Sequence, residues 1–286
     1  MTLQLVPDAY GDARNAKYLA VASDLAYLPE AEAVTKFREQ LGLDARLLTG
    51  DNTQVYVGTD DANLVVAFRG TEDPTSIDGL KDCLLTDALN LLMVPEGRLG
   101  TDFAAAGVGA RFHQGFIHAL ANVWDALLPE VESRWESGRR LLWITGHSLG
   151  GALALLSSWL FMRKMIEVHQ VVTFGAPMVG NPAATAAFDR ELSGRIFRYC
   201  NENDPVPMLP SLSMLANEYS HCDRLMSNAP ALGTLGSLMG SLASRAVDGL
   251  IRGSLIDEVW AEIRNRLQAH FITSYHKLVD DLSRKA

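Results

Sequence analysis

Five residues near the middle of the chain, Gly146-His147-Ser148-Leu149-Gly150, match the pattern G-x-S-x-G. This pattern holds a nucleophilic serine on a sharp turn between a strand and a helix. The surroundings fit, since the charge-free run LLWIT (141–145) precedes the motif and a helical pattern follows it over 150–167. The helix amino terminus and the N–H of Leu149 would face the oxygen that becomes negative during acyl transfer. We therefore predict that Ser148 is a nucleophile; the alternative is an ordinary glycine-rich turn.

A serine hydroxyl is a weak nucleophile at neutral pH, so a histidine must accept its proton and a carboxylate must orient that histidine. In enzymes with this turn, the acid and then the base follow the serine along the chain. Asp204 is the preferred acid, because it lies in the turn-forming segment NENDPVP (201–207) after the predicted strand 195–200. A loop-capping role is the alternative for Asp204. Glu202 and Asp223 are the other acid candidates.

Three histidines follow Asp204 in the sequence and are candidates for the base. His221 lies in what looks like the last strand, whereas His270 and His276 flank a terminal helical segment. Position along the chain does not decide between them.

Strand and helix patterns alternate around these residues. Helices are predicted between 15 and 41, with a break at Pro29, and over 116–135 and 182–192; strands are predicted at 53–57, 63–68, 141–145, 170–175 and 195–200. Such alternation predicts an α/β protein with a mainly parallel central sheet flanked by helices. We expect one domain over residues 1–286, because no repeat or proline-rich linker divides the chain.

Composition and charge exclude several classes of function. The net charge of −9 leaves no basic surface for nucleic acid. The three cysteines are scattered without metal-ligand spacing, so we expect no disulfide framework, no metal and no cofactor. No stretch is long enough for a transmembrane segment, and the amino terminus lacks a secretory signal. These features predict a cytoplasmic protein or one exported by a leaderless route.

Further motifs occur in a fixed order along the chain. They are Arg69-Gly70-Thr71, His113-Gln114-Gly115-Phe116, the segment 145–154 around Ser148, TFGAP (173–177) and NDPVP (203–207). Together they resemble the class 3 lipases, the family of the filamentous-fungal triacylglycerol lipases, from the first helices to the end of the chain. The resemblance implies an α/β-hydrolase fold and a Ser-Asp-His triad.

The resemblance also implies roles for individual residues. Thr71 and the N–H of Leu149 would supply the two donors of an oxyanion hole. His270 would be the base, because bacterial and plant members often have a histidine five residues before a tyrosine near the end, as His270 and Tyr275 are. His221 would correspond to a family histidine that is usually structural.

Two long stretches interrupt the alternation of strands and helices. Residues 83–112 correspond to the lid of the family, a helix that covers the serine in water and moves away at a lipid surface. A plain packed helix is the alternative for this apolar stretch. We expect residues 209–255 to form a helical insertion or a second cap.

These observations predict a serine hydrolase that cleaves carboxylic esters of lipids through an acyl-enzyme intermediate, as a triacylglycerol lipase or carboxylesterase. Its substrate would lie at an oil–water or membrane interface. A phospholipase A1 or monoacylglycerol lipase is the alternative, because the same groups attack any acyl ester. A non-catalytic hydrolase-like binding protein is disfavoured, because a nucleophile, an acid, a base and an oxyanion donor all occur in order. The sequence leaves the oligomeric state open.

Overall fold

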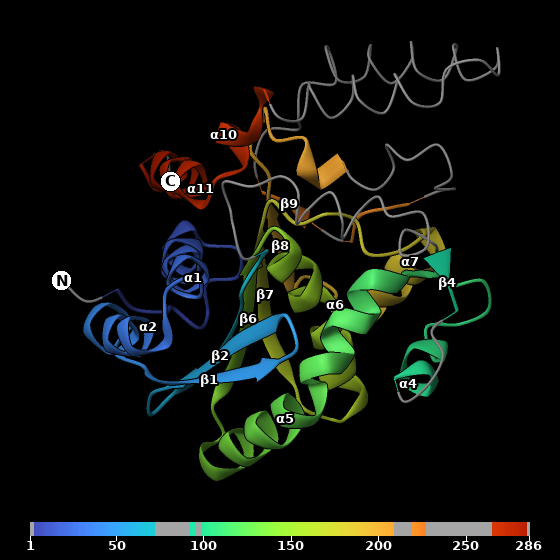
Figure 1. Cartoon of the computed structure of the whole chain (residues 1–286), viewed down its shortest axis with the longest axis horizontal. Helices are drawn as coiled ribbons and strands as arrows, with labels where there is room; N and C mark the ends of the chain where they lie inside the picture. The colour runs from blue at the N-terminus through green and yellow to red at the C-terminus, as the bar shows by residue number, and fades with distance from the viewer. Residues whose placement is uncertain are drawn as a thin grey trace.

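A computed structural model describes residues 3–71, 92–94, 99–208, 219–222, 224–226 and 265–284. These residues form a central sheet with the strand order β1-β2-β3-β6-β7-β8-β9 (Figure 1). The strands are β1 (Asp44–Gly50), β2 (Thr53–Thr59), β3 (Asn63–Phe68), β6 (Leu141–His147), β7 (Val168–Phe174), β8 (Ile196–Tyr199) and β9 (Arg224–Leu225). Strands β1, β2 and β3 pair antiparallel, whereas β3, β6, β7, β8 and β9 run parallel. The sheet is therefore mainly parallel, as the sequence predicted.

The register of the parallel strands brings their carboxyl ends to one edge of the sheet. Phe68 of β3 pairs with Gly146 of β6, and Gly146 pairs with Thr173 of β7. Phe174 of β7 pairs with Tyr199 of β8. The loops that leave these four strands therefore begin side by side, which is where ligands bind in sheets of this kind.

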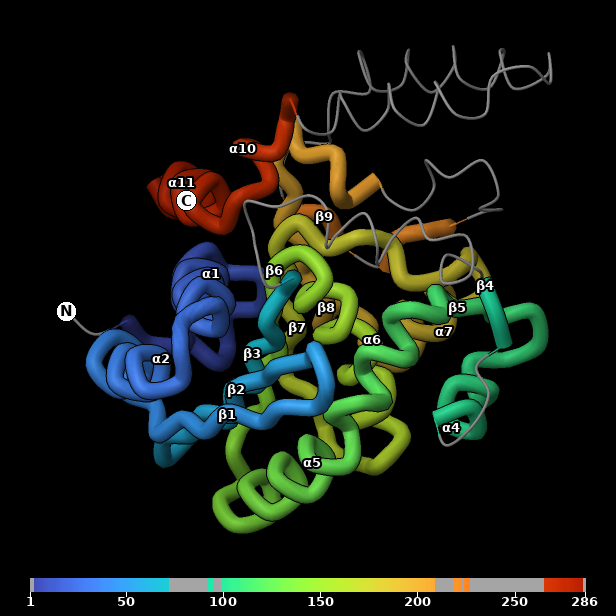
Figure 2. Tube along the Cα trace, viewed as in Figure 1, coloured from blue at the N-terminus to red at the C-terminus, as the bar shows by residue number. Residues whose placement is uncertain are grey.

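Helices cover both faces of the sheet (Figure 1). One face carries α5 (Gln114–Gly138), α6 (Leu149–Arg163) and α7 (Pro182–Glu191). The other face carries α1 (Ala13–Leu25) and α11 (Ile272–Ser283). Helices α1 and α11 pack against each other although they come from opposite ends of the sequence (Figure 2).

Strand β6 explains the charge-free run that precedes Ser148. Leu142 and Ile144 belong to the apolar cluster under α5 and α6, whereas Trp143 belongs to the cluster under α1 and α11. Successive side chains of a strand point to opposite faces, so a strand with two covered faces needs apolar residues at consecutive positions. Burial on both faces fixes the end of β6, and with it Ser148, near the middle of the sheet.

Most of the predicted elements are confirmed. The two helices on either side of Pro29 are α1 and α2 (Glu30–Lys36), and α2 continues as a π-helical turn over Phe37–Leu41. The predicted strands correspond to β2, β3, β6, β7 and β8, and the predicted helices after them to α5, α6 and α7. Strand β1 has no counterpart in the prediction.

The predicted lid and insertion lie largely outside the described residues. Within 83–112, β4 (Leu92–Met93) pairs antiparallel with β5 (Phe112–His113), and α4 (Gly100–Ala104) lies between them in sequence. Within 209–255, the described residues include β9. The roles of both stretches therefore stay predictions.

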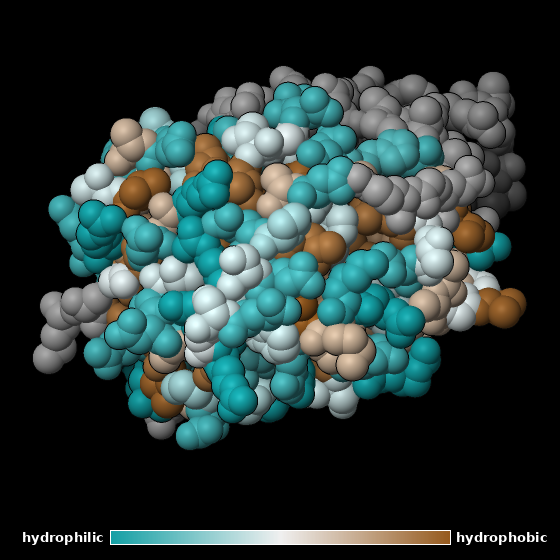
Figure 3. All heavy atoms as spheres, turned by 90° about the horizontal axis from the view of Figure 1, so that it is seen from below, coloured by the Kyte–Doolittle hydropathy of each residue, from teal (hydrophilic) through white to brown (hydrophobic). Residues whose placement is uncertain are grey.

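The face of the molecule in Figure 3 presents mostly hydrophilic side chains, with apolar ones between them. Val108, in the segment between α4 and β5, is an apolar side chain that is fully exposed. Single exposed apolar residues are usual on protein surfaces. Among the described residues, no helix is both long enough and apolar enough to cross a membrane.

Candidate active site

Ser148 lies at the sharp turn between β6 and α6. Its backbone has φ 57° and ψ −129°, and its N–H donates to the Phe174 carbonyl over 2.9 Å. A positive φ is strained for a residue with a side chain and persists where the surroundings impose it. Serine at the start of a helix usually caps the backbone, yet Ser148 makes no side-chain cap bond. In this strained turn, the Ser148 hydroxyl therefore makes no capping hydrogen bond to the first turn of α6.

Glycines on both sides of Ser148 make this turn possible. A Cβ atom at Gly146 would lie 2.2 Å from the Gly150 carbonyl oxygen, and one at Gly150 would lie 2.4 Å from the Phe68 carbonyl oxygen. Both distances are far shorter than a van der Waals contact. The two glycines of the motif are therefore required by close packing of backbone on backbone.

Asp204 and His270 form a buried hydrogen-bonded pair. His270 Nδ1 lies 2.8 Å from Asp204 Oδ2, and the two residues are 4% and 1% exposed. The other carboxylate oxygen, Oδ1, accepts the Val206 N–H over 2.9 Å. Because Nδ1 donates to the carboxylate, the lone pair of the ring is on Nε2. His270 Nε2 is buried and has no hydrogen-bond partner within the described part of the chain, so it is available to accept a proton.

Tyr275 also donates its hydroxyl proton to Asp204 Oδ2. It is completely buried, and burial raises the pKa of Tyr275, so the hydroxyl keeps the proton that it donates. The Tyr275 oxygen in turn accepts the Asn201 N–H over 3.2 Å. The sequence pointed to Tyr275 through its spacing from His270, but gave it no contact with the acid.

His270 lies directly beside the turn that carries Ser148. Its ring is 4.6 Å from the ring of His147, centroid to centroid, and its carbonyl oxygen is 2.6 Å from His147 Nε2. His270 ends the short helix α10 (Leu267–His270), which precedes α11 at the carboxyl edge of the sheet (Figure 1). The fold thus brings the pair of Asp204 and His270 next to the turn that carries Ser148.

The segments that carry Thr71 and Leu149 touch each other. A Cβ atom at Gly150 would lie 2.9 Å from the Arg69 carbonyl carbon, and one at Gly70 would lie 2.9 Å from the His147 carbonyl oxygen. Leu149 is the first residue of α6, so its N–H belongs to the first turn, where backbone donors lack a partner within the helix. The two predicted oxyanion donors therefore belong to adjoining segments.

The other two candidate histidines make contacts elsewhere. His221 Nε2 lies 2.6 Å from the Pro207 carbonyl oxygen and must donate to it, and burial lowers the pKa of His221 to about 3. His276 Nε2 lies 3.1 Å from Asp24 Oδ2. Of the alternative acids, Glu202 is exposed and Asp223 lies outside the described residues.

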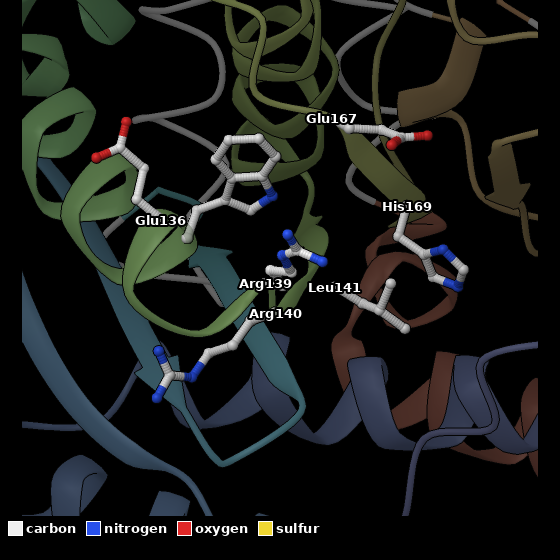
Figure 4. Close-up of a pocket in the computed structure, with 7 residues that line it drawn as sticks. Glu136, Arg139, Arg140, Leu141, Glu167 and His169 are labelled. Carbon is white, nitrogen blue, oxygen red and sulfur yellow. The ribbon is translucent and has the colours of Figure 1, made fainter.

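A cavity of about 490 Å³ lies at the opposite end of the parallel strands (Figure 4). Its lining includes Leu141, at the start of β6, and His169, near the start of β7. Ser148 follows the carboxyl end of β6. This cavity is therefore separate from the cluster of Ser148, Asp204 and His270.

Known proteins share this arrangement of elements. Lip2 lipase from Yarrowia lipolytica superimposes with a TM-score of 0.60 at 20% sequence identity, over 73% of this chain and 76% of that one. This likeness, together with the mainly parallel sheet flanked by helices, shows the α/β-hydrolase fold.

Comparison of sequences finds relatives with higher identity over a smaller share of this chain. A secreted mono- and diacylglycerol lipase of Malassezia globosa, MDL3, is 29% identical over 196 residues, which is 65% of this chain and 62% of the relative. The triacylglycerol lipase OBL1 of Arabidopsis thaliana is 33% identical over 56% of this chain and 37% of the relative. The matched segments thus span less than two thirds of either relative.

Residues 65–214 match the profile of one family, described as lipase (class 3). The match covers more than half of the chain and includes Thr71, the turn around Ser148 and Asp204. The chain therefore belongs to the class 3 lipase family.

Proposed function

We propose that this protein hydrolyses carboxylic esters of lipids, with Ser148 as nucleophile, His270 as base and Asp204 as the acid that orients the base. The observation that carries the proposal is the arrangement of the His270 ring beside the Ser148 turn: Nδ1 donates to a buried carboxylate, while Nε2 has no hydrogen-bond partner among the described residues. Relatives named as lipases for mono-, di- and triacylglycerols support a lipid ester as the substrate.

The reaction would run in two steps. The Ser148 hydroxyl oxygen attacks the ester carbonyl carbon while His270 Nε2 takes the hydroxyl proton, and the carbonyl oxygen becomes negative between donors on Thr71 and Leu149. Asp204 holds the imidazole in the Nδ1–H tautomer and stabilises its positive charge. The imidazolium then protonates the departing alcohol. Water repeats the sequence on the acyl-enzyme and releases the fatty acid.

The direct test is hydrolysis of p-nitrophenyl esters of increasing chain length by the wild type and by Ser148→Ala. We expect the variant to lose activity by about a thousandfold or more. Equal rates in the two proteins would refute the proposal and would favour a non-catalytic role.

Histidine variants test the assignment of the base. His270→Ala should lose activity to a similar extent, whereas His276→Ala, which removes a contact with Asp24, should keep most of it. A rate loss in His276→Ala with none in His270→Ala would overturn the assignment of His270.

Phospholipase A1 or monoacylglycerol lipase activity remains the alternative within the same chemistry. A panel of tri-, di- and monoacylglycerols and a phosphatidylcholine, all with the same acyl chain, separates these activities by relative kcat/KM.

The proposed lid at 83–112 adds a further expectation: the rate should rise steeply once the substrate exceeds its solubility limit. A smooth saturation curve would argue against the lid.

A further inference from the structure

Two further side chains, Tyr27 and His147, connect three of the segments that carry the proposed catalytic groups. Tyr27 follows helix α1, and its hydroxyl lies 2.8 Å from His147 Nδ1. His147 Nε2 lies 2.6 Å from the carbonyl oxygen of His270. These contacts join residues 120 and 123 positions apart in the sequence. They connect the end of α1, the nucleophile turn and the loop of the base.

The His270 carbonyl oxygen fixes the direction of both hydrogen bonds, because it can only accept. A carbonyl oxygen accepts, so His147 Nε2 must carry the hydrogen, and His147 Nδ1 must therefore accept the hydroxyl proton of Tyr27. Burial lowers the pKa of His147 well below its ordinary value, which keeps the ring neutral, as this tautomer requires. Burial also raises the pKa of Tyr27, so its hydroxyl keeps the proton.

Tyr27 also reaches the segment of the predicted oxyanion donor Thr71. The Tyr27 oxygen, which donates its hydrogen to His147 Nδ1, also lies against the backbone of Gly70. A Cβ atom at Gly70 would lie 2.0 Å from this oxygen. Gly70 adjoins Thr71 in the sequence, so the Tyr27 hydroxyl holds the peptide backbone next to that donor.

We propose that Tyr27 and His147 are positioning residues, which fix the oxyanion segment, the nucleophile turn and the base relative to one another. Tyr27 packs against the Gly70 backbone, and hydrogen bonds run from Tyr27 to His147 and from His147 to the His270 carbonyl. The inference rests on the proposed ester hydrolysis. Neither side chain has to touch the substrate, because each acts on the backbone or on a neighbouring side chain of a catalytic segment.

Contacts of the His147 ring add to the hydrogen bonds. The ring lies 4.6 Å from the ring of His270 at 33°, and 5.7 Å from the ring of Tyr275 in an edge-on arrangement. The His147 ring therefore contacts both the backbone carbonyl and the ring of His270. It also contacts Tyr275, which binds Asp204. Small displacements of reacting groups carry large rate penalties, of the order of a hundredfold for about 1 Å.

Tyr27→Phe tests the pair, with Tyr18→Phe as the matched control. Tyr18 is a buried tyrosine of α1 whose hydroxyl donates to the Leu41 carbonyl over 2.9 Å, away from the catalytic segments. With p-nitrophenyl butyrate, we expect Tyr27→Phe to lower kcat by about tenfold or more while KM changes by less than about twofold. Tyr18→Phe should lower the melting temperature but leave kcat unchanged. An unchanged kcat in Tyr27→Phe, or an equal loss in both variants, overturns the inference.

A second pair of variants tests His147 and decides the question if Tyr27→Phe fails to fold. Glutamine can place an N–H near the position of Nε2, whereas leucine cannot donate at all. We expect the kcat of His147→Gln to be at least about tenfold higher than that of His147→Leu. Equal kcat values in the two variants overturn the role of the His147 donor.

Ser148→Ala, run in the same assay, separates the two hypotheses. If it retains the wild-type rate, the proposed hydrolysis itself fails. If it is inactive while Tyr27→Phe and His147→Leu keep the wild-type kcat, the hydrolysis stands and the positioning role fails.

Discussion

Gly175 offers a sharp test of how closely the proposed catalytic groups are packed. It follows β7 with φ +61°, and a Cβ atom at this position would lie 2.9 Å from Asp204 Oδ2, 3.1 Å from His270 Cε1 and 2.8 Å from the Tyr275 hydroxyl oxygen. Ordinary contacts are about 3.5 Å or longer. In Gly175→Ala, Asp204 and His270 must therefore retreat by about half an ångström, away from a site whose geometry sets the rate.

The expected magnitudes follow from these distances. The left-handed backbone costs alanine about 1–2 kcal/mol of folding free energy. Because a displacement of about 1 Å can cost a hundredfold in rate, half of that should lower kcat by about tenfold. Stability and activity should thus both fall, for two different reasons.

Gly42→Ala is the matched control. Gly42 has φ +70°, and a Cβ atom there would meet nothing within 4 Å. The control therefore carries the same backbone cost without the contact at the site. Melting temperatures from circular dichroism and kcat for a short p-nitrophenyl ester separate the two effects. If both variants lose the same stability and both keep the wild-type kcat, the reasoning about the packing at Gly175 is refuted.

Three further predictions rest on single contacts. Tyr275→Phe removes a hydroxyl donor from the buried Asp204 carboxylate, so we expect a lower kcat and a loss of about 1–3 kcal/mol in urea unfolding. Burial lowers the pKa of His113 to about 3; since the unfolded state binds its proton near pH 6.5, stability is full above that pH, and this histidine should remove about 2 kcal/mol between pH 7 and pH 5. Gly146→Ala should not yield folded protein, because its Cβ atom would collide with the Gly150 backbone.

Each of these three predictions would be contradicted by a specific result. An unchanged kcat and stability in Tyr275→Phe would show that its hydroxyl does not matter to Asp204. Asparagine can replace the His113 Nδ1 that accepts the Phe116 N–H, so His113→Asn should weaken the pH dependence of unfolding; an equal pH dependence in variant and wild type would contradict the assignment. Soluble, active Gly146→Ala would mean that the turn tolerates a side chain.

The nucleophile turn was predictable from the sequence because its determinants are local. The motif needs a buried strand before it and a helix after it, and both leave patterns in adjacent residues, as LLWIT (141–145) does. The parallel sheet was predictable for the same reason. Strand β1 was missed because its residues, DARLLTG, alternate between exposed and buried positions only weakly. Strand β9 (Arg224–Leu225) forms the end of the segment 218–225 that the sequence suggested as the last strand, and His221 lies before it.

The base could not be derived from the residues alone, because the relevant proximity is tertiary. His221 lies in a predicted strand, whereas His270 and His276 flank a predicted helix, and neither position shows which histidine approaches Ser148. The family resemblance was needed to favour His270. The structure separates the three by their partners: the Pro207 carbonyl, Asp204 and Asp24. The link between Tyr27 and His147 was likewise hidden, because no local pattern connects residues 120 positions apart.

The distance along the chain between the nucleophile turn and the base has a consequence for biosynthesis. His147 and His270 are separated by 123 residues, and α11, which carries Tyr275, rests on α1 through contacts such as Lys17 with Asp280. A ribosome therefore makes every strand that the structure describes before it makes His270, the proposed base. With His270 as the proposed base, we expect a polypeptide truncated ahead of α10 to carry Ser148 without the group that activates it, and so not to cleave esters.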